Sequence, residues 1–147
     1  MTADVMSTLR AFYASEAAYL TDGSGFEEMA RHLAPDVVMR QASSLPYGGD
    51  WHGHDGFRRF LAAMRESWDG LWFDEQHFLD DEASVVVYSR GRLRARRTGR
   101  ILETSLLQWI SFRDGLITEF RPYYHDTSAI LAALTEGPSA AQPPSAD

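Results

Sequence analysis

A glutamate at position 16 interrupts an apolar helical pattern, and its carboxyl group could do proton chemistry there. A helix is predicted over residues 4–20, and the apolar residues around position 16 are Leu9, Phe12, Tyr13 and Leu20. A carboxyl group facing this stripe would be poorly solvated, its pKa would rise, and it could serve as a general acid or base. If the helix is rotated by one residue, Glu16 is instead an ordinary surface residue.

Two glutamines on predicted strands could bind an oxygen atom. Gln41 ends a strand predicted over residues 37–41, and Gln108 lies within a strand predicted over residues 100–113. A side-chain amide can hydrogen-bond a carbonyl or hydroxyl group. The alternative is that both are ordinary polar residues on half-buried strands, satisfied by their neighbours.

Other reactive residue combinations are missing from the sequence. The chain has no cysteine, which excludes disulfides, thiolate nucleophiles and cysteine-ligated metals. His52 and His54 fall in one segment, but without a carboxylate or third histidine at ligand spacing no metal site is expected. There is no glycine-rich nucleotide loop and no nucleophile elbow, so no cofactor is expected.

Composition and charge restrict the class of partner. The 147 residues carry 14 basic and 21 acidic side chains, and a formal charge of −7 argues against general nucleic-acid binding. No apolar run is long enough for a membrane helix and no secretory signal is seen, so we expect a cytoplasmic protein without membrane contact. Lys and Asn, whose codons are AT-rich, are absent, which indicates a GC-rich bacterial genome.

Cap and turn signals place three helices before the strands. Ser24 and Glu27 form a capping-box pattern that opens a short second helix, and Pro35 ends it. Asp55 is expected to cap a third helix, whose apolar stripe is Phe57, Phe60, Leu61, Met64 and Trp68.

The second half of the chain is predicted to be a β meander. Turn signals separate strands at 71–79, 85–97, 100–113 and 116–124. A short helix is predicted at 127–134. Residues 1–136 are expected to form one domain, and the low-complexity residues 137–147 a disordered tail.

Several short motifs, taken in chain order, carry a resemblance to a known family. They are Ala34-Pro35-Asp36, Leu45-Pro46-Tyr47-Gly48-Gly49, Thr98-Gly99-Arg100 and Phe112-Arg113-Asp114-Gly115. This order resembles the nuclear-transport-factor-2-like superfamily, and within it the SnoaL-like polyketide cyclase and ketosteroid-isomerase-related branch. The resemblance implies an α+β, cone-shaped fold in which three N-terminal helices pack on a curved, mainly antiparallel sheet and enclose a cavity. The fold hosts enzymes and binding proteins, so it leaves the function open.

The resemblance also implies which residues face the cavity. In the steroid isomerase a carboxylate base faces an oxyanion hole made by a tyrosine and a protonated aspartate. The base position matches Gln41, the protonated acid matches Gln108, and the tyrosine matches Glu16. Amides do not exchange protons near neutral pH, so the isomerase reaction is not expected, and Glu16 becomes the proton-transferring group. Tyr13 or Tyr47 would polarise the substrate oxygen.

The expected site therefore has two groups of residues. The expected catalytic residues are Glu16, Tyr13, Gln41 and Gln108. The residues expected to contact the substrate are Met39, Tyr47, Trp51, Trp68, Leu93, Phe120 and Tyr124. Aromatic residues dominate protein cores as well as cavity walls, so core packing is the alternative for Tyr47, Trp51 and Trp68.

Strand alternation predicts a distinct outer face. Arg90, Arg92, Arg94 and Arg96 share one side of a strand, which is either a solvated face or a surface for an anionic partner such as an acyl carrier protein. Leu107 and Trp109 have the parity opposite to the inward set Thr104, Leu106, Gln108, Ile110 and Phe112. Two large apolar groups on the outside indicate a homodimer through this face.

The expected function is that of a cofactor-independent enzyme of secondary metabolism. It would act on a hydrophobic, oxygenated small molecule as a cyclase, isomerase or dehydratase, by general acid–base chemistry in a closed cavity. One alternative is a non-catalytic small-molecule binding protein of the same fold. The other is a purely structural dimerisation domain.

Overall fold

The computed structural model describes residues 3–135 and has one six-stranded sheet with four helices in that part of the chain. The helices are α1 (Ala3–Asp22), α2 (Phe26–Ala30), α3 (Gly53–Ser67) and α4 (Thr127–Thr135). The strands are β1 (Leu33–Gln41), β2 (Gly49–His52), β3 (Trp68–Asp81), β4 (Ser84–Ala95), β5 (Ile101–Arg113) and β6 (Leu116–Tyr124). Their order in the sheet is β2-β1-β6-β5-β4-β3. Only β1 and β6 pair in parallel, so the sheet is mainly antiparallel.

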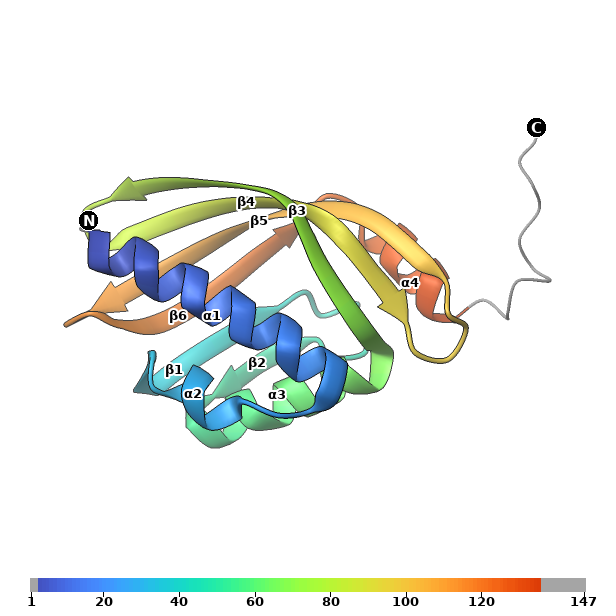
Figure 1. Cartoon of the computed structure of the whole chain (residues 1–147), viewed down its shortest axis with the longest axis horizontal. Helices are drawn as coiled ribbons and strands as arrows, with labels where there is room; N and C mark the ends of the chain where they lie inside the picture. Colours follow the sequence, from blue (N-terminus) through green and yellow to red (C-terminus); the bar gives the residue numbers. More distant parts are fainter. Residues whose placement is uncertain (1–2, 136–147) are drawn as a thin grey trace.

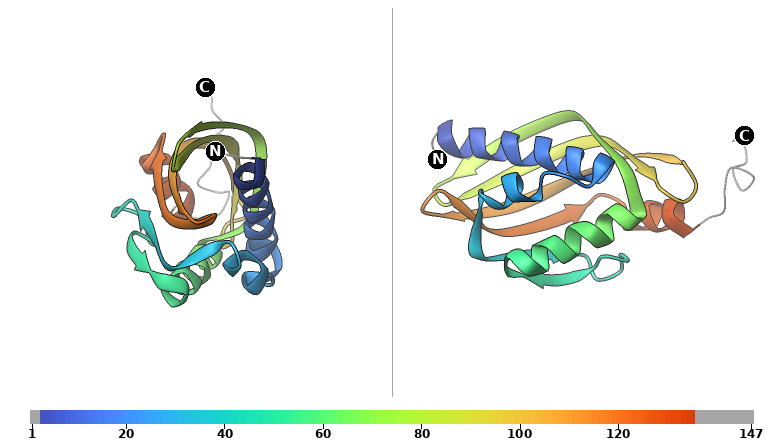
Figure 2. Two further views of the ribbon diagram at one scale, coloured as in Figure 1. Left: turned by 90° about the vertical axis from the view of Figure 1, so that its left-hand side faces the viewer. Right: turned by 60° about the horizontal axis from the view of Figure 1, so that its bottom comes forward.

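The sheet curls around the N-terminal helices without closing into a barrel (Figure 1). Seen along the long axis, α1 lies at the open side of the curl, where it packs against β3 (Figure 2). Helix α3 packs against β1 and β2, and α4 lies at the far end against β5. The α+β, cone-like architecture expected from the sequence is confirmed. None of the helices described is long and apolar enough to cross a membrane.

The core between helices and sheet is centred on three phenylalanines. Phe12 of α1, Phe57 of α3 and Phe120 of β6 have ring centroids 4.8–6.0 Å apart. All three side chains are fully buried. Aromatic groups of this size bury a large apolar area, so this cluster ties both long helices to the sheet.

Two of the predicted helix caps are wrong. Ser24 does not cap α2, because its backbone and hydroxyl groups both donate to Asp22 Oδ1, at 2.9 and 2.6 Å. Gly25 stands at the N-cap in the left-handed region, which glycine adopts at little cost. Asp55 lies inside the first turn of α3 and accepts from Arg59 Nε at 3.2 Å, while His52 holds the N-cap position.

Several strand boundaries also differ from the prediction. β1 begins at Leu33 and includes Pro35, which the sheet accommodates through a register shift between Leu33 and Val38. The short edge strand β2 was not expected, and β3 begins at Trp68, three residues early. The predicted tail at 137–147 lies outside the described residues.

A glycine in β4 allows β3 to bend over the sheet. The register of β3 against β4 shifts between Phe73 and Glu75, beside Gly91. A Cβ atom at Gly91 would stand 2.1 Å from the backbone oxygen of Trp72. No side chain fits there, so the close approach of the two strands depends on this glycine.

We expect Gly91→Ala to lower the free energy of unfolding by roughly 1–3 kcal/mol, because the methyl group forces the two strands apart. Urea denaturation followed by circular dichroism measures this directly. A variant as stable as the wild type would contradict the role given to Gly91.

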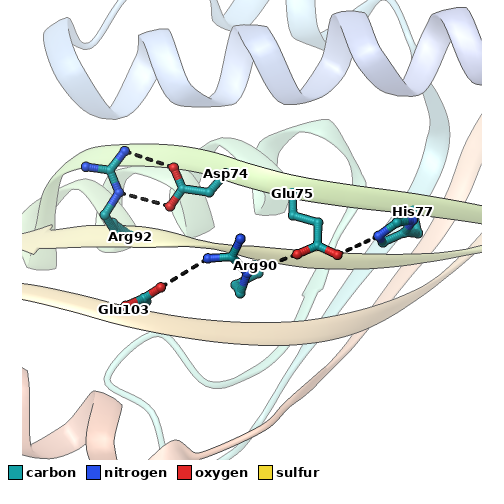
Figure 3. A network of polar contacts seen from close by, with 6 residues as sticks. All are labelled: Asp74, Glu75, His77, Arg90, Arg92 and Glu103. Atoms are coloured by element: carbon teal, nitrogen blue, oxygen red, sulfur yellow. Dashed lines mark hydrogen bonds and ion pairs between the residues drawn. The ribbon is translucent and has the colours of Figure 1, made fainter.

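The outer face of β4 is a ladder of ion pairs (Figure 3). Arg92 makes two hydrogen bonds of 3.0 Å to Asp74, and Arg90 bridges Glu75 and Glu103 at 3.0 and 3.1 Å. The third cation, Arg94, contacts Asp69 at 2.7 Å, and the fourth, Arg96, donates to the backbone oxygen of Arg65. The arginines at 90, 92 and 94 thus face four carboxylates, so this stretch has no excess of positive charge for an anionic partner.

An apolar patch lies on the same outer face, over β5 and β6. Leu107, Trp109 and Tyr123 are 46%, 47% and 57% exposed, and Leu107 pairs directly with Tyr123 across the two strands. Directly opposite residues of paired strands project from the same face. The outward parity predicted for Leu107 and Trp109 is therefore present.

We predict that two chains associate through this patch. Static light scattering at micromolar concentration should give twice the chain mass of 16.6 kDa. Trp109→Glu should give the single-chain mass, because a carboxylate would have to be buried in the interface. Ala62→Glu, on the exposed side of α3, serves as the control. A wild-type protein with the mass of one chain would rule the dimer out.

Candidate functional site

The inner face of the sheet and two helices enclose a small cavity. Its volume is about 60 Å³. Its wall is formed by Tyr13, Glu16, Met39, Gln41, Met64, Leu71, Phe73, Leu93, Thr104, Leu106, Gln108 and Tyr124. Half of these side chains are apolar and two more are tyrosines with apolar rings, so the polar groups stand in poorly solvated surroundings.

Glu16 is the acidic residue of this wall. It lies on the buried face of α1, one turn after Phe12 and Tyr13 and one turn before Leu20, and is only 9% exposed. It makes no hydrogen bond or ion pair with any described residue. Burial raises its pKa from 4.5 to about 7, because the charged form loses hydration. The carboxyl group can therefore both give and take a proton near neutral pH.

Two tyrosines hold the two glutamines. Tyr13 of α1 donates its hydroxyl hydrogen to Gln108 Oε1 of β5. Tyr124 of β6 donates to Gln41 Oε1 of β1 at 2.6 Å. Burial, and to a lesser extent Glu16, raises the pKa of Tyr13 well above its ordinary value, and burial does the same for Tyr124. Both tyrosines therefore stay neutral and remain donors.

Seven of the eleven predicted site residues line the cavity. They are Tyr13, Glu16, Met39, Gln41, Leu93, Gln108 and Tyr124. The first helix thus has the rotation that turns Glu16 inward.

The other four predicted residues lie outside the cavity wall. Tyr47 and Trp68 are fully buried and bonded to each other, with Trp68 Nε1 donating to the Tyr47 hydroxyl at 2.9 Å. Trp51 Nε1 donates to the Tyr47 backbone oxygen at 3.0 Å, and Phe120 belongs to the phenylalanine core. Burial raises the pKa of Tyr47 to about 12. These aromatic residues pack the core, which was the alternative reading for Tyr47, Trp51 and Trp68.

Five residues of the wall were not among the predicted site residues. Thr104 and Leu106 have the inward parity already assigned to β5, and Met64 lies on the apolar stripe of α3, so the sequence held a signal for each. The sequence held no such signal for Leu71 and Phe73, because the register shift in β3 decides which of its side chains point inward.

The site offers acid–base chemistry and hydrogen bonding. Within residues 3–135, no group of three His, Asp or Glu side chains is placed to hold a metal ion. The proton-active groups of the wall are Glu16 and two tyrosines whose hydroxyl hydrogens are engaged by glutamines. A ligand in the cavity would therefore meet one carboxyl group, two amides and the hydroxyl group of Thr104.

The fold and the family of this chain are shown by comparison with known proteins. An NTF2-like protein of unknown function from Burkholderia pseudomallei K96243 superposes with a TM-score of 0.80 at 22% identity, covering 92% of this chain and all of that one. TerC, co-crystallised with polyporic acid, superposes with a TM-score of 0.78 at 22% identity, and the match covers 91% of this chain and 100% of TerC. A protein provisionally named a SnoaL-like polyketide cyclase, from Jannaschia sp. CCS1, superposes with a TM-score of 0.77 at 15% identity. The match covers 92% of this chain and 94% of that protein.

The match to a family model is more specific than these likenesses of fold. Residues 7–120 match the SnoaL-like domain, so the chain belongs to that family, as the sequence motifs indicated. No curated protein matches the sequence significantly.

Stability should depend on pH through Glu16. Its pKa is about 7 in the folded chain, against 4.5 for a solvated glutamate such as that of the unfolded chain. The folded chain therefore binds this proton more tightly. The resulting stabilisation is full below pH 4.5 and is lost as the pH rises through 7. A shift of 2.5 pKa units corresponds to roughly 3 kcal/mol.

We therefore expect Glu16→Gln, which cannot ionise, to gain stability relative to the wild type between pH 5 and pH 8, by up to about 3 kcal/mol. Urea denaturation across this range measures the difference, with the exposed Glu66→Gln as the matched control. Parallel curves for the wild type and Glu16→Gln would show that the carboxyl group is solvated.

Proposed function

We propose that this chain is a cofactor-independent enzyme that moves a proton within a hydrophobic, oxygenated small molecule, as in a cyclisation, isomerisation or dehydration. The observation that carries the proposal is the buried Glu16 carboxyl group, which lacks a partner among the described residues and has a pKa of about 7. A general acid–base group works best when its pKa lies near the operating pH, because both protonation states are then available.

The chemical step follows from the groups in the wall. The Glu16 carboxylate takes a proton from a carbon next to a carbonyl group, and the electron pair of the broken C–H bond moves onto the carbonyl oxygen. Amide hydrogens of Gln41 and Gln108 can bond that oxygen. The protonated Glu16 then returns the proton to carbon, or gives it to a hydroxyl group on the neighbouring carbon. In the second case the C–O bond breaks, the electron pair of the enolate forms the new C=C bond, and water leaves. Either route restores the carboxylate.

The volume of the cavity bears on the size of the substrate. About 60 Å³ is well below the roughly 300–1,000 Å³ of typical small-molecule pockets, so a ring compound requires side chains to move. Met39 and Met64 are unbranched and change rotamer easily, and both line the wall. The complex of TerC with polyporic acid supports the choice of an aromatic, oxygenated compound as the first probe.

We expect Glu16→Gln to slow proton exchange at carbon by about 10²–10⁴-fold while leaving ligand binding nearly intact. A panel of cyclic ketones is incubated with protein in D₂O, and mass spectrometry follows deuterium uptake next to the carbonyl group. Glu66→Gln should exchange at the wild-type rate. Full activity in Glu16→Gln would show that Glu16 is not the base.

A non-catalytic binding protein is the second candidate, and the two glutamines favour it. Amides hold a ligand but do not exchange protons. Both glutamines line the cavity, and the resemblance to the steroid isomerase matches them to its two acids. Binding of polyporic acid without deuterium uptake by any ketone of the panel, and without conversion of candidate metabolites, would favour this function over an enzyme.

A further inference from the structure

The two tyrosine–glutamine pairs determine which end of each amide is free. A glutamine side chain has one acceptor oxygen and two amide hydrogens. Tyr13 occupies Oε1 of Gln108, and Tyr124 occupies Oε1 of Gln41. The side of each amide that remains is therefore its NH₂ group.

These NH₂ groups are poorly satisfied by the protein. Gln108 Nε2 has no hydrogen-bond acceptor within the part of the chain that the structure describes. Gln41 Nε2 contacts only the sulfur of Met39, at 3.5 Å. A thioether is a weak acceptor, and both glutamines line the cavity. The hydrogen-bonding groups that the two amides leave unused are therefore N–H donors.

The tyrosine hydroxyls offer no free hydrogen. Each hydroxyl hydrogen is engaged by a glutamine oxygen, and neither tyrosine makes a hydrogen bond to Glu16. The sequence had suggested Tyr13 as the group that polarises the substrate oxygen. With its hydrogen committed, Tyr13 acts instead on Gln108.

We propose that Tyr13 and Tyr124 are positioning residues, which hold Gln108 and Gln41 with their NH₂ groups toward the cavity, so that the site binds its ligand through a carbonyl or enolate oxygen. This inference rests on the proposed function, because it assigns the ligand-binding groups of the same cavity. Removing either hydroxyl frees one amide to turn, and its donors then lose their fixed direction.

The role of the tyrosines is testable in the ligand-free protein. Each glutamine NH₂ group gives a pair of ¹H–¹⁵N signals, assigned by loss in Gln41→Glu and Gln108→Glu. Tyr13→Phe should shift the Gln108 pair and leave the Gln41 pair in place, and Tyr124→Phe should do the reverse. Tyr19→Phe, on α1 but outside the cavity wall, should move neither pair.

The pKa of Glu16 shows whether Tyr13 holds Gln108 or instead donates a hydrogen bond to the Glu16 carboxylate. If Tyr13 donated to the Glu16 carboxylate, its removal would raise the pKa of Glu16, since a bond to the charged form would be lost. In our proposal that pKa, followed through the ¹³C shift of the Glu16 carboxyl group, changes little in Tyr13→Phe. An unmoved Gln108 pair, or a clear rise in the Glu16 pKa, overturns the assignment.

Ligand binding tests the donor chemistry. Gln108→Glu keeps an oxygen acceptor for Tyr13 but removes the NH₂ donors. It should weaken polyporic acid binding at least about tenfold, as expected for the loss of a hydrogen bond to the ligand. Tyr13→Phe should weaken binding by a smaller factor. Equal affinity in the wild type and Gln108→Glu would overturn the donor role.

Ligand binding and the amide signals of the ligand-free protein test different claims. If the wild-type protein does not bind polyporic acid, the ligand class of the proposed function is wrong. The amide signals of the ligand-free protein still decide whether the tyrosines hold the glutamines.

Discussion

The loss of hydration at one carboxyl group, that of Glu16, sets the proton affinity of the cavity wall. Glu16 occupies a position on α1 where the helical period favours apolar side chains, and it is buried against the inner face of the sheet. Because no cation among residues 3–135 lies against it, burial is not compensated there by an ion pair, and the group responds by holding its proton more tightly. The aromatic core around Phe12, Phe57 and Phe120 must supply the stability that makes such a residue tolerable.

The polar groups of the cavity complement this carboxyl group in a definite way. The two tyrosine–glutamine pairs and Glu16 come from α1, β1, β5 and β6, so each tyrosine–glutamine hydrogen bond bridges separate elements. Neutral donors surround a group that alternates between charged and uncharged forms. Such an arrangement stabilises negative charge on a ligand oxygen without placing a second ionisable acid beside Glu16.

Periodicity predicted most of the fold and part of the site. The stripe around Glu16 and the alternation on β4 and β5 were sufficient to turn Glu16, Leu93 and Gln108 toward the cavity, since both patterns depend only on local geometry. The cap of α2 and the start of β1 were wrong because a side chain–side chain contact at Asp22 and a register shift beside Pro35 overrode local preference.

The polar pairs were beyond the reach of the sequence. Tyr13 and Gln108 are 95 positions apart, and Tyr124 and Gln41 are 83 apart. No short motif connects residues so distant. Likewise, whether Tyr47 and Trp68 line a cavity or bond each other behind its wall depends on the bend of the sheet and not on their own neighbours in sequence.

The parallel pairing of β1 with β6 also sets the order in which the chain can fold. β1 ends at Gln41 and β6 begins at Leu116, so these neighbours in the sheet come from opposite halves of the chain. When the protein is synthesised, the first three helices and β1 emerge long before β6, the strand that completes their apolar surface. The closing of a loop of this length is slow compared with the formation of a helix or hairpin. The cavity and its polar pairs are therefore a late product of folding, assembled only when β6 enters between β1 and β5.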